Sequence, residues 1–230
     1  RAGDPREARL YLVLFDVDGT LIDSQHMITA AMGRAFAACG RPAPSRAETL
    51  GVVGLSLDVA MARLLGRAEI DDDARALSAC YKESFFDLRS SADHQEPFYP
   101  GAREALDALS ARDDVLIGLA TGKSMRGVRA ILSLHGLEGR FATLQTAGNP
   151  SKPHPGMIHA ALAETGVAPQ KAVIIGDTTY DIEMAGAAGI VAIGVGWGYH
   201  AESALERAGA TRVIHHFDQL LPTLDDLFDW

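Results

Sequence analysis

The stretch that decides the fold is LYLVLFDVDGTL, residues 10–21. Its first six residues are continuously apolar, as expected for a strand that helices cover on both faces of a parallel sheet. Asp16 and Asp18 follow, one residue apart, and Gly19 comes next. Open α/β sheets bind ligands at the carboxyl ends of their strands, which is where these acids would lie. An Asp-Gly turn after an edge strand is the alternative, because this dipeptide is common in hairpins.

Further apolar runs, separated by segments of helical spacing, also end in polar clusters. Thr121 follows one such run and Gly176-Asp177 follows another. The strand candidates after the first are residues 115–120, 172–175, 189–195 and 211–215. Strand and helix alternate after residue 98, which predicts an α/β fold with a doubly wound, Rossmann-like parallel sheet.

The region between the first strand and residue 98 has a different pattern, with helices and no convincing strand. Ser24 is a candidate N-cap, and apolar residues then recur at helical spacing until Gly40. Residues 57–65 and 72–88 have helical patterns as well. We therefore predict two domains. Residues 9–22 and 98–230 form the α/β core, and residues 23–97 form an all-helical cap inserted over the end of the first strand.

Composition and charge exclude several classes of function. Of the 230 residues, 47% are hydrophobic and 22% charged, as in ordinary soluble proteins, and the net charge of −9 argues against binding nucleic acid or anionic membranes. No apolar run is long enough to span a membrane, and residues 1–9 lack the apolar centre of a signal peptide. We expect a cytoplasmic monomer or dimer in which Cys39 and Cys80 are core thiols in a reducing compartment.

The two acids after the first strand suit phosphoryl transfer. Asp16 would attack phosphorus and form an aspartyl-phosphate, while Asp18 would protonate the leaving oxygen and later activate water. An acidic nucleophile that approaches a phosphate needs a counter-charge, and Mg²⁺ bound by carboxylates supplies one. Asp177 can complete that site, and Asp181 could support the metal or its waters. A helix capping box between Thr178 and Asp181 fits the same spacing.

The phosphate needs hydrogen-bond donors as well. Thr121 and the backbone N–H of Gly122 can hold its oxygens at a helix start. Lys152 lies in a proline-rich loop and could reach the phosphate and Asp16 together. A solvated loop lysine is the alternative for this residue.

Taken together, these residues resemble the haloacid-dehalogenase-like superfamily, in its helical-cap, phosphoglycolate-phosphatase-like branch. The motifs are Asp16-Val17-Asp18-Gly19-Thr20, Thr121 after an apolar strand, Lys152 before Pro153, and Gly176-Asp177 with Asp181. The resemblance implies that Asp16 is the nucleophile, Asp18 the acid/base, and Thr121 and Lys152 the phosphate binders. It implies that Asp16, the Asp18 carbonyl and Asp177 bind the metal, with Asp181 beside them.

The predicted substrate-binding residues come from three segments: Gly19, Thr20, Gly54, Leu55 and Gly122. Gly54 and Leu55 belong to the segment of residues 51–56, which resembles the specificity loop of this cap type. A plain helix–helix turn is the alternative for that segment.

The resulting prediction is a Mg²⁺-dependent phosphatase that hydrolyses a small, phosphoglycolate-like phosphate monoester. A carboxylated substrate would need a cation from the cap, for which Arg46, Arg63 and Lys82 are available. A sugar phosphomutase is the first alternative, although such enzymes usually carry a cap histidine where this chain has Ile28. A non-catalytic scaffold on the same fold is the second.

Two glycine-rich segments mimic nucleotide-binding motifs. Residues 118–124 resemble a P-loop but have one residue too few between the glycines. Residues 194–198 lack the spacing of a dinucleotide fingerprint and are expected to form a loop near the phosphate pocket.

Overall fold

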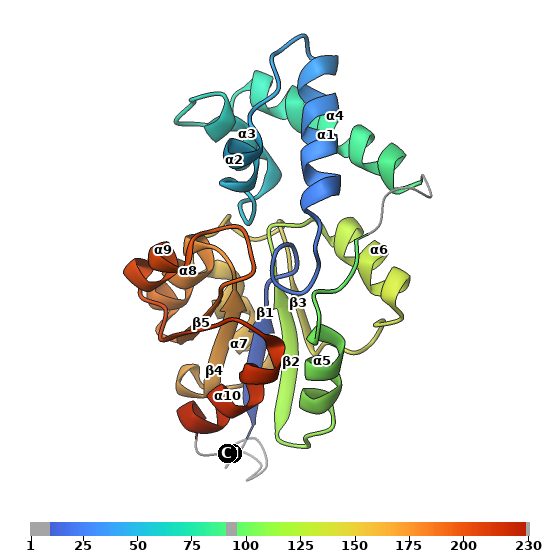
Figure 1. The fold of residues 1–230 in the computed structure, drawn as a ribbon. Coiled ribbons are helices and arrows are strands. Elements are labelled where there is room, and N and C mark those ends of the chain that lie inside the picture. The colour runs from blue at the N-terminus through green and yellow to red at the C-terminus, as the bar shows by residue number, and fades with distance from the viewer. Residues whose placement is uncertain (1–9, 91–95, 229–230) are drawn as a thin grey trace.

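The computed structural model describes residues 10–90 and 96–228, so the predicted absence of a signal peptide in residues 1–9 lies outside it. Six strands form one sheet in the order β3-β2-β1-β4-β5-β6, and every neighbouring pair is parallel (Figure 1). The strands are β1 (Tyr11–Phe15), β2 (Val115–Ala120), β3 (Thr143–Gln145), β4 (Ala172–Gly176), β5 (Val191–Val195) and β6 (Arg212–Ile214). The expected parallel α/β sheet is confirmed, and the short β3 is a strand that the sequence patterns did not predict.

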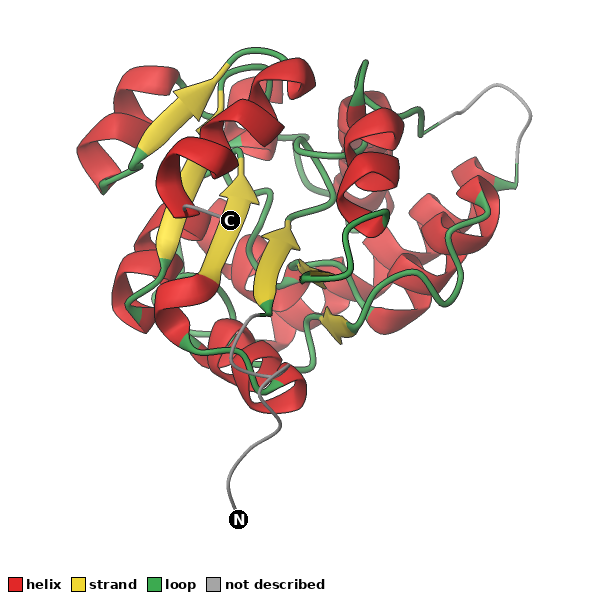
Figure 2. Cartoon of the chain, turned by 90° about the horizontal axis from the view of Figure 1, so that it is seen from below, coloured by secondary structure: helices red, strands yellow, loops and turns green. Residues whose placement is uncertain are grey.

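Helices cover both faces of this sheet, as the view along the strands shows (Figure 2). Those of the core are α5 (Ala102–Ser110), α6 (Met125–His135), α7 (Gly156–Thr165), α8 (Thr179–Ala188), α9 (Glu202–Ala208) and α10 (Leu220–Phe228), with the 3₁₀ turns η2 (Pro169–Lys171) and η3 (Phe217–Gln219).

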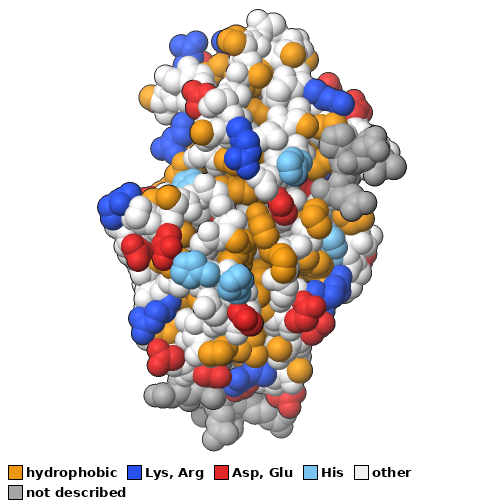
Figure 3. All heavy atoms as spheres, in the orientation of Figure 1, with side chains coloured by type: hydrophobic (Ala, Val, Ile, Leu, Met, Phe, Trp, Pro, Cys, Tyr) orange, Lys and Arg blue, Asp and Glu red, His pale blue; other side chains and the backbone are white. Residues whose placement is uncertain are grey.

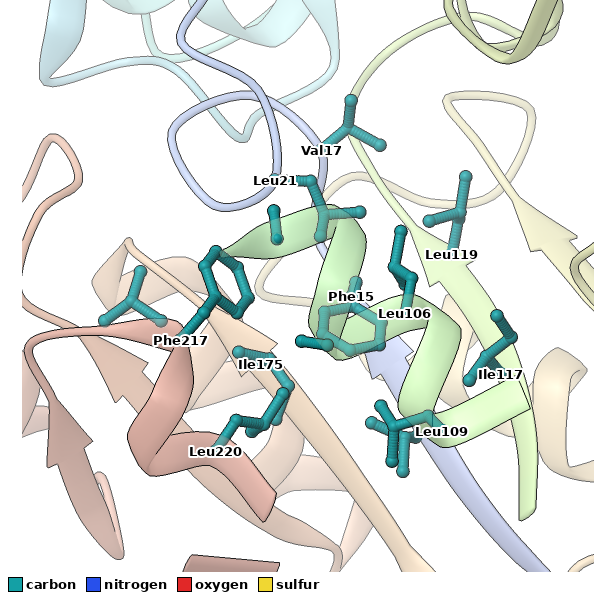
Figure 4. Packing of buried hydrophobic residues seen from close by; sticks show 14 of the residues in the cluster. Phe15, Val17, Leu21, Leu106, Leu109, Ile117, Leu119, Ile175, Phe217 and Leu220 are labelled. Carbon is teal, nitrogen blue, oxygen red and sulfur yellow. The ribbon is translucent and has the colours of Figure 1, made fainter. Parts of the chain in front are cut away.

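The central strand β1 is buried on both sides. Side chains alternate along a strand, so Val13 and Phe15 belong to one hydrophobic cluster and Leu12 and Leu14 to the other. The first cluster includes side chains of α5 and α10, with Leu106 and Leu109 of α5 beside the sheet residues Phe15 and Ile117 (Figure 4). The second includes side chains of α7, α8 and α9. Burial on both faces explains why the sequence of β1 is apolar without alternation.

A helical lobe stands over the carboxyl ends of the strands (Figure 1). Its helices are α1 (Gln25–Ala38), α2 (Arg46–Leu50), α3 (Leu57–Leu64) and α4 (Asp72–Arg89). The lobe has a hydrophobic cluster of its own, which includes Phe36, Met61 and Leu77. The described residues between Asp23 and Pro97 form helices and turns, as expected, and their role as an inserted cap stays a prediction.

The two segments that connect the lobe to the core run side by side. The Asp23 N–H donates to the Pro97 carbonyl (2.8 Å), and the Tyr99 N–H donates to the Leu21 carbonyl (2.9 Å). These bonds lie next to the predicted domain limits, residues 22/23 and 97/98. The division into two domains stays a prediction.

Ser24 precedes α1 as predicted, but it does not cap the helix. Its backbone angles (φ −99°, ψ 2°) are not the extended ones that an N-cap needs, and its side chain makes no capping hydrogen bond. The hydroxyl donates instead to Asp18 Oδ1 at 2.5 Å. The predicted capping role of Ser24 is therefore wrong, and its contact points to the site at the strand ends.

The two cysteines lie together at the interface of α1 and α4. Both are half-buried free thiols, and their sulfur atoms are 3.0 Å apart. The hydrogen bond with Cys80 raises the pKa of Cys39, as does burial. The prediction of core thiols thus needs correction, since both cysteines are only half-buried. Their mutual contact was not predicted.

Charged side chains of both signs are interspersed over the face drawn in Figure 3. Within the described part of the chain, each helix is too short or too polar to cross a bilayer. The expected cytoplasmic location, the monomeric or dimeric state and the lack of nucleic-acid binding stay predictions.

Candidate active site

Asp16 and Asp177 meet because their strands are neighbours. Asp16 directly follows β1 and Asp177 directly follows β4, and the two strands pair with Phe15 opposite Ile175. The Asp16 N–H continues this ladder by donating to the Ile175 carbonyl at 2.9 Å. Parallel neighbours end at the same edge, so both carboxylates lie at the carboxyl end of the sheet. Both are buried.

Lys152 is buried between two carboxylates. Only 1% of its surface is exposed, and its Nζ lies 3.0 Å from Asp16 Oδ2 and 2.6 Å from Asp181 Oδ1. Burial alone would lower the pKa of Lys152, but the charges of Asp16 and Asp181 outweigh it and raise the pKa above its ordinary value. Lys152 is therefore a charged, buried group, and the alternative of a solvated loop lysine is wrong.

Asp181 has both of its carboxylate oxygens engaged. Oδ1 accepts from Lys152, while Oδ2 accepts from the backbone N–H (3.1 Å) and the hydroxyl (2.7 Å) of Thr178. The Thr178–Asp181 capping box that the spacing allowed is thus present at the start of α8. These bonds suit Asp181 to holding Lys152 in place, and its predicted role beside a metal stays a prediction.

Gly19 and Thr20 lie against Asp177 and not among the residues that line the cavity described below. Thr20 Oγ1 donates to Asp177 Oδ1 (3.0 Å), and the Tyr199 N–H donates to Oδ2 (2.9 Å). Gly19 has φ +85°, and a Cβ there would come within 2.2 Å of Asp177, as one on Gly198 would at 2.1 Å. Residues 194–198 therefore end beside the acidic site. The expected loop begins only at Gly196, because Gly194 and Val195 belong to β5. The predicted contact of Gly19 and Thr20 with substrate stays untested.

The acidic cluster fits a hard divalent cation. One carboxylate oxygen from each of Asp16, Asp177 and Asp181 lies within 4.8 Å of the others. Three carboxylates against the one ammonium of Lys152 leave two negative charges uncompensated in a buried site. Asp16 Oδ2 is buried, and none of the described residues donates a hydrogen bond to it, although Lys152 is in ion-pair range. An all-oxygen set with this charge suits Mg²⁺.

Without a cation, the same crowding changes the protonation of the acids. Burial is the largest cause and raises the pKa of Asp16 from 3.8 to about 7, while Lys152 opposes it and Asp181 and Asp18 add to it. Burial and the Asp16 charge raise the pKa of Asp177 well above its ordinary value. Either protons or a cation must therefore balance the cluster.

Asp18 lines the cavity, as Asp16 does. Its Oδ1 accepts from Ser24 Oγ (2.5 Å) and lies 3.0 Å from Lys123 Nζ. The Lys123 Nζ is also 3.7 Å from Oε1 of Glu96, the residue before Pro97. Among the described contacts, Asp18 Oδ2 has none, so this oxygen is available to a bound molecule.

The phosphate-binding loop predicted after β2 touches the insertion. Thr121 is buried, and its hydroxyl oxygen accepts from the Lys123 N–H at 3.2 Å, which leaves the hydroxyl hydrogen for a ligand. A Cβ on Gly122 would lie 2.5 Å from the carbonyl oxygens of both Gly54 and Leu55. Three of the five predicted substrate-binding residues, Gly54, Leu55 and Gly122, thus lie together. They line the same cavity as Asp16, Asp18 and Thr121.

These residues line a cavity of about 650 Å³ between the core and the insertion. The segment of residues 51–56 is a turn between α2 and α3, and residues 52–56 line the cavity. Its role as a specificity loop stays a prediction. Of the three basic residues considered for a substrate carboxylate, only Lys82 lines the cavity. Arg46 instead donates to the side chain of Gln25, and Arg63 donates to the Tyr180 hydroxyl at 2.5 Å.

Sequence reasoning missed the remaining cavity residues of note, Lys123 and the α4 side chains Tyr81, Phe85 and Phe86. Lys123 had a usable signal, because it follows Thr121 at the same sheet edge as Asp18. It stood out only as part of the rejected P-loop. The aromatic residues gave no signal in the sequence, because an apolar residue on α4 can line the cavity or pack inside the lobe with the same helical spacing.

Known proteins share this sequence and fold. The family described as "Haloacid dehalogenase-like hydrolase" matches residues 13–195. "Probable phosphatase IndB" of Dickeya dadantii is 31% identical over 214 residues, which cover 91% of either chain. A "Phosphoglycolate phosphatase" of Pseudomonas putida is 31% identical over 222 residues, covering 94% of this chain and 80% of the relative. The crystal structure of a hydrolase from Pseudomonas syringae aligns with a TM-score of 0.82 at 27% identity, covering 94% of this chain and 99% of that one.

The family match runs from β1 to β5 and includes the motifs that follow β1, β2 and β4. The relatives cover nearly the whole chain, insertion included. The family, the fold and the enzyme class expected from the sequence are thereby confirmed. The chain belongs to the haloacid dehalogenase-like hydrolase family.

Proposed function

We propose that the protein is a Mg²⁺-dependent phosphatase that hydrolyses a small phosphate monoester through a phosphorylated Asp16. The observation that carries the proposal is the pairing of two carboxylates of different surroundings at one cavity wall. Asp16 is buried in an ion pair with Lys152, whereas Asp18 Oδ2 has no contact with a donor among the described residues. A nucleophile and an acid/base need this difference.

In the first half-reaction, an oxygen of the Asp16 carboxylate attacks phosphorus and the ester P–O bond breaks. Asp18 gives a proton to the departing alkoxide, so the alcohol leaves neutral. Thr121 and the N–H groups after β2 hold phosphate oxygens, and Lys152 keeps Asp16 oriented. In the second half-reaction, Asp18 takes a proton from water, the water oxygen attacks phosphorus, and the Asp16–phosphate bond breaks. The sum is ester plus water giving alcohol plus phosphate.

The residues that would hold Mg²⁺ are Asp16, Asp177 and the main-chain carbonyl of Asp18, with Asp181 as support. When bound there, the ion supplies charge neutralisation for the phosphoryl oxygens. Thr20 and the Tyr199 N–H fix the Asp177 carboxylate for this purpose. The fit of three buried carboxylates to a divalent ion supports this assignment.

Residues 23–97 act as the cap of this site. The turn of residues 51–56 meets the phosphate loop at Gly122, and the Ser56 N–H donates to Ser151 Oγ at 2.8 Å, next to Lys152. In this position the insertion covers the acids and keeps bulk water from the phosphorylated Asp16.

The test is phosphate release from a panel of phosphate monoesters, 2-phosphoglycolate among them because one relative bears that name. Release should depend on Mg²⁺, and Asp16→Asn should lower it by ~10³-fold or more because the nucleophile is lost. Acid-quenched wild-type protein should carry one phosphoryl group on Asp16, detected by peptide mass spectrometry. Thermal unfolding of the variant serves as the control for folding.

Wild-type release by Asp16→Asn would show that the nucleophile is assigned wrongly. An isomeric product without net phosphate release would favour the phosphomutase alternative. The cavity position where that alternative expects a histidine holds Ile28, which cannot transfer a proton.

A further inference from the structure

The cavity above the catalytic acids has two chemically different ends. At the core end lie Asp16, Asp18 and Thr121, which suit a phosphoryl group. The insertion supplies much of the rest of the wall, together with residues 123–127 and 146–148 of the core. The large apolar side chains of the insertion that line it include Ile28, Met32, Val52, Tyr81, Phe85 and Phe86. At about 650 Å³, the cavity is in the size range of sites that bury ligands well beyond a two-carbon acid.

The cations at the inner wall already have partners. Lys123 faces Asp18 and Glu96, and its Nζ is 5.2 Å from the centre of the Phe85 ring. Arg89 donates to Glu96 (Nε to Oε2, 2.8 Å) and its guanidinium lies 5.1 Å from the same ring. Lys123 and Arg89 could therefore bind a substrate carboxylate only by breaking an ion pair with a carboxylate of the protein.

The two remaining basic residues of the wall lie at its exposed rim. Lys82 is exposed and has no ion pair with any of the described residues, so its charge is solvated. Arg126, also exposed, lies over one face of the Phe86 ring, 5.0 Å from its centre. A carboxylate carried on a two-carbon alcohol would stay deep in the cavity, beside aliphatic and aromatic groups, where an unpaired charge is costly.

Phe86 is the exposed part of the aromatic wall. It is 56% exposed while lining the cavity, whereas large apolar side chains are normally covered. With Arg126 on one face, the rest of the ring is open to a ligand. An exposed aromatic side chain continuous with a catalytic site marks a contact for an apolar group.

We propose that the alcohol part of the substrate is uncharged and carries an aromatic ring, which packs against Phe85 and Phe86 of α4. This inference rests on the proposed phosphatase function and names the substrate class of that site. The phosphoryl group lies at Asp16 and Thr121, and the ring lies under the insertion. Aromatic pairs and apolar burial both favour this arrangement over a short carboxylated chain.

The test compares three esters of primary alcohols, so that the leaving oxygens are of one type: ethyl phosphate, 2-phosphoglycolate and 2-phenylethyl phosphate. We expect kcat/KM for 2-phenylethyl phosphate to exceed that of the other two by about 10-fold or more, the effect of burying one phenyl ring. Equal values, or a preference for 2-phosphoglycolate that Lys82→Ala removes, would overturn the inference.

Variants separate ring contact from a general effect on the lobe. Phe86→Ala should raise KM for 2-phenylethyl phosphate by about 10-fold and leave ethyl phosphate unchanged. Leu134→Ala is the matched control, since Leu134 is a 60% exposed apolar residue outside this cavity, and it should change neither. A loss with both esters in Phe86→Ala would argue against a ring contact.

Failure of the proposed function gives a different pattern, in which none of the three esters releases phosphate. Calorimetry on the wild-type protein with Mg²⁺ then decides the inference without turnover. Binding of 2-phenylethyl phosphate at least 10-fold tighter than ethyl phosphate supports the aromatic site, and equal affinities overturn it.

Discussion

A lysine buried between Asp16 and Asp181 is the residue on which the charge balance of the site depends. Replacing it by methionine keeps the size of the side chain and removes the charge. We expect Lys152→Met to lower the free energy of unfolding by about 3–5 kcal/mol, because it leaves two buried carboxylates without a cation. Denaturant unfolding in the presence of a chelator measures this directly.

Two further variants keep that result interpretable. Lys82→Met removes an exposed lysine and should change the free energy of unfolding by less than about 0.5 kcal/mol. Adding Asp181→Asn to Lys152→Met should recover part of the loss, since the buried carboxylate of Asp181, which Lys152 no longer balances, is then gone. A Lys152→Met protein as stable as wild type would mean that the buried carboxylates are protonated in the native state.

At the residue scale, the sequence predicted the strand ends and two side-chain contacts, Lys152 with Asp16 and Thr178 with Asp181, but not the remaining contacts of the site. An apolar run followed by an acid located Asp16 and Asp177 at one sheet edge, because parallel strands share their polarity. The bond between Lys152 and Asp181 depends on where the residue-152 loop comes back to the sheet, and the bond of Ser24 to Asp18 depends on the exit angle of the chain after β1. Neither path leaves a periodic pattern in the sequence.

The contact between the loop after β2 and the turn between α2 and α3 gives the first prediction for whole elements. A Cβ at position 122 would lie 2.5 Å from two carbonyl oxygens of the insertion, and backbone atoms cannot move aside singly. We expect Gly122→Ala to push the insertion away from the core and lower kcat/KM by about 10-fold or more. Steady-state kinetics on the best substrate measure the effect.

Gly148→Ala is the matched control for that experiment. Gly148 also lines the cavity, but a Cβ there would meet no described atom within 4 Å. Its kcat/KM should stay within about 2-fold of wild type. Equal losses in the two variants would mean that the Gly122 contact with the insertion is not the cause.

The thiol pair between α1 and α4 gives a second prediction at this scale. Oxidised dithiothreitol should convert Cys39 and Cys80 to a disulfide, with both thiol hydrogens and two electrons passing to the reagent. The sulfur atoms are already 3.0 Å apart and the residues are separated by 41 positions. Closing such a loop is worth up to about 4 kcal/mol of stability. Mass spectrometry and unfolding with and without reductant measure both effects.

The single variants Cys39→Ser and Cys80→Ser are the controls, since neither can form the link. If wild-type protein keeps two alkylatable thiols after oxidation, α1 and α4 do not hold the sulfur atoms together in solution.

Element length explains part of the difference between the helices and strands that the sequence predicted and those that it missed. The helices α1, α3 and α4 agree with the predicted segments to within two residues at each end, because each shows several turns of apolar spacing. Helix α2 and strand β3 have five and three residues and were missed. One turn of helix is too short to show a period. Strand β6 is as short as β3 but lies within the predicted segment 211–215, so length alone does not explain why β3 was missed.

Over the whole molecule, the chain places its acidic groups at one sheet edge and covers them with the lobe. The core segments that carry Asp16, Lys152 and Asp177 lie on either side of the insertion in the sequence, and only the sheet order brings them together. Burial of these carboxylates makes the stability of the protein depend on pH and on metal, because the folded state must bind protons or a cation that the unfolded chain does not need.

This linkage predicts a stability that falls with rising pH when no metal is present. The folded pKa of Asp16 is raised from 3.8 to about 7, so the contribution of its proton is complete below the unfolded pKa and is lost as the pH rises through about 7. Asp177 shifts in the same direction. With a chelator present, we expect the Tm to fall by roughly 4 °C or more between about pH 5.5 and pH 7.5.

Adding Mg²⁺ should reverse this fall, because a divalent ion replaces the protons in balancing the carboxylates and binds only the folded state. The rise in Tm on adding Mg²⁺ should therefore be larger at about pH 7.5 than at about pH 5.5, where protons compete for the same oxygens. Asp16→Asn removes one of the uncompensated charges and should flatten the pH dependence measured with chelator. A wild-type Tm that rises over this range, with an equal gain from Mg²⁺ at both pH values, would show that the cluster is balanced in some other way.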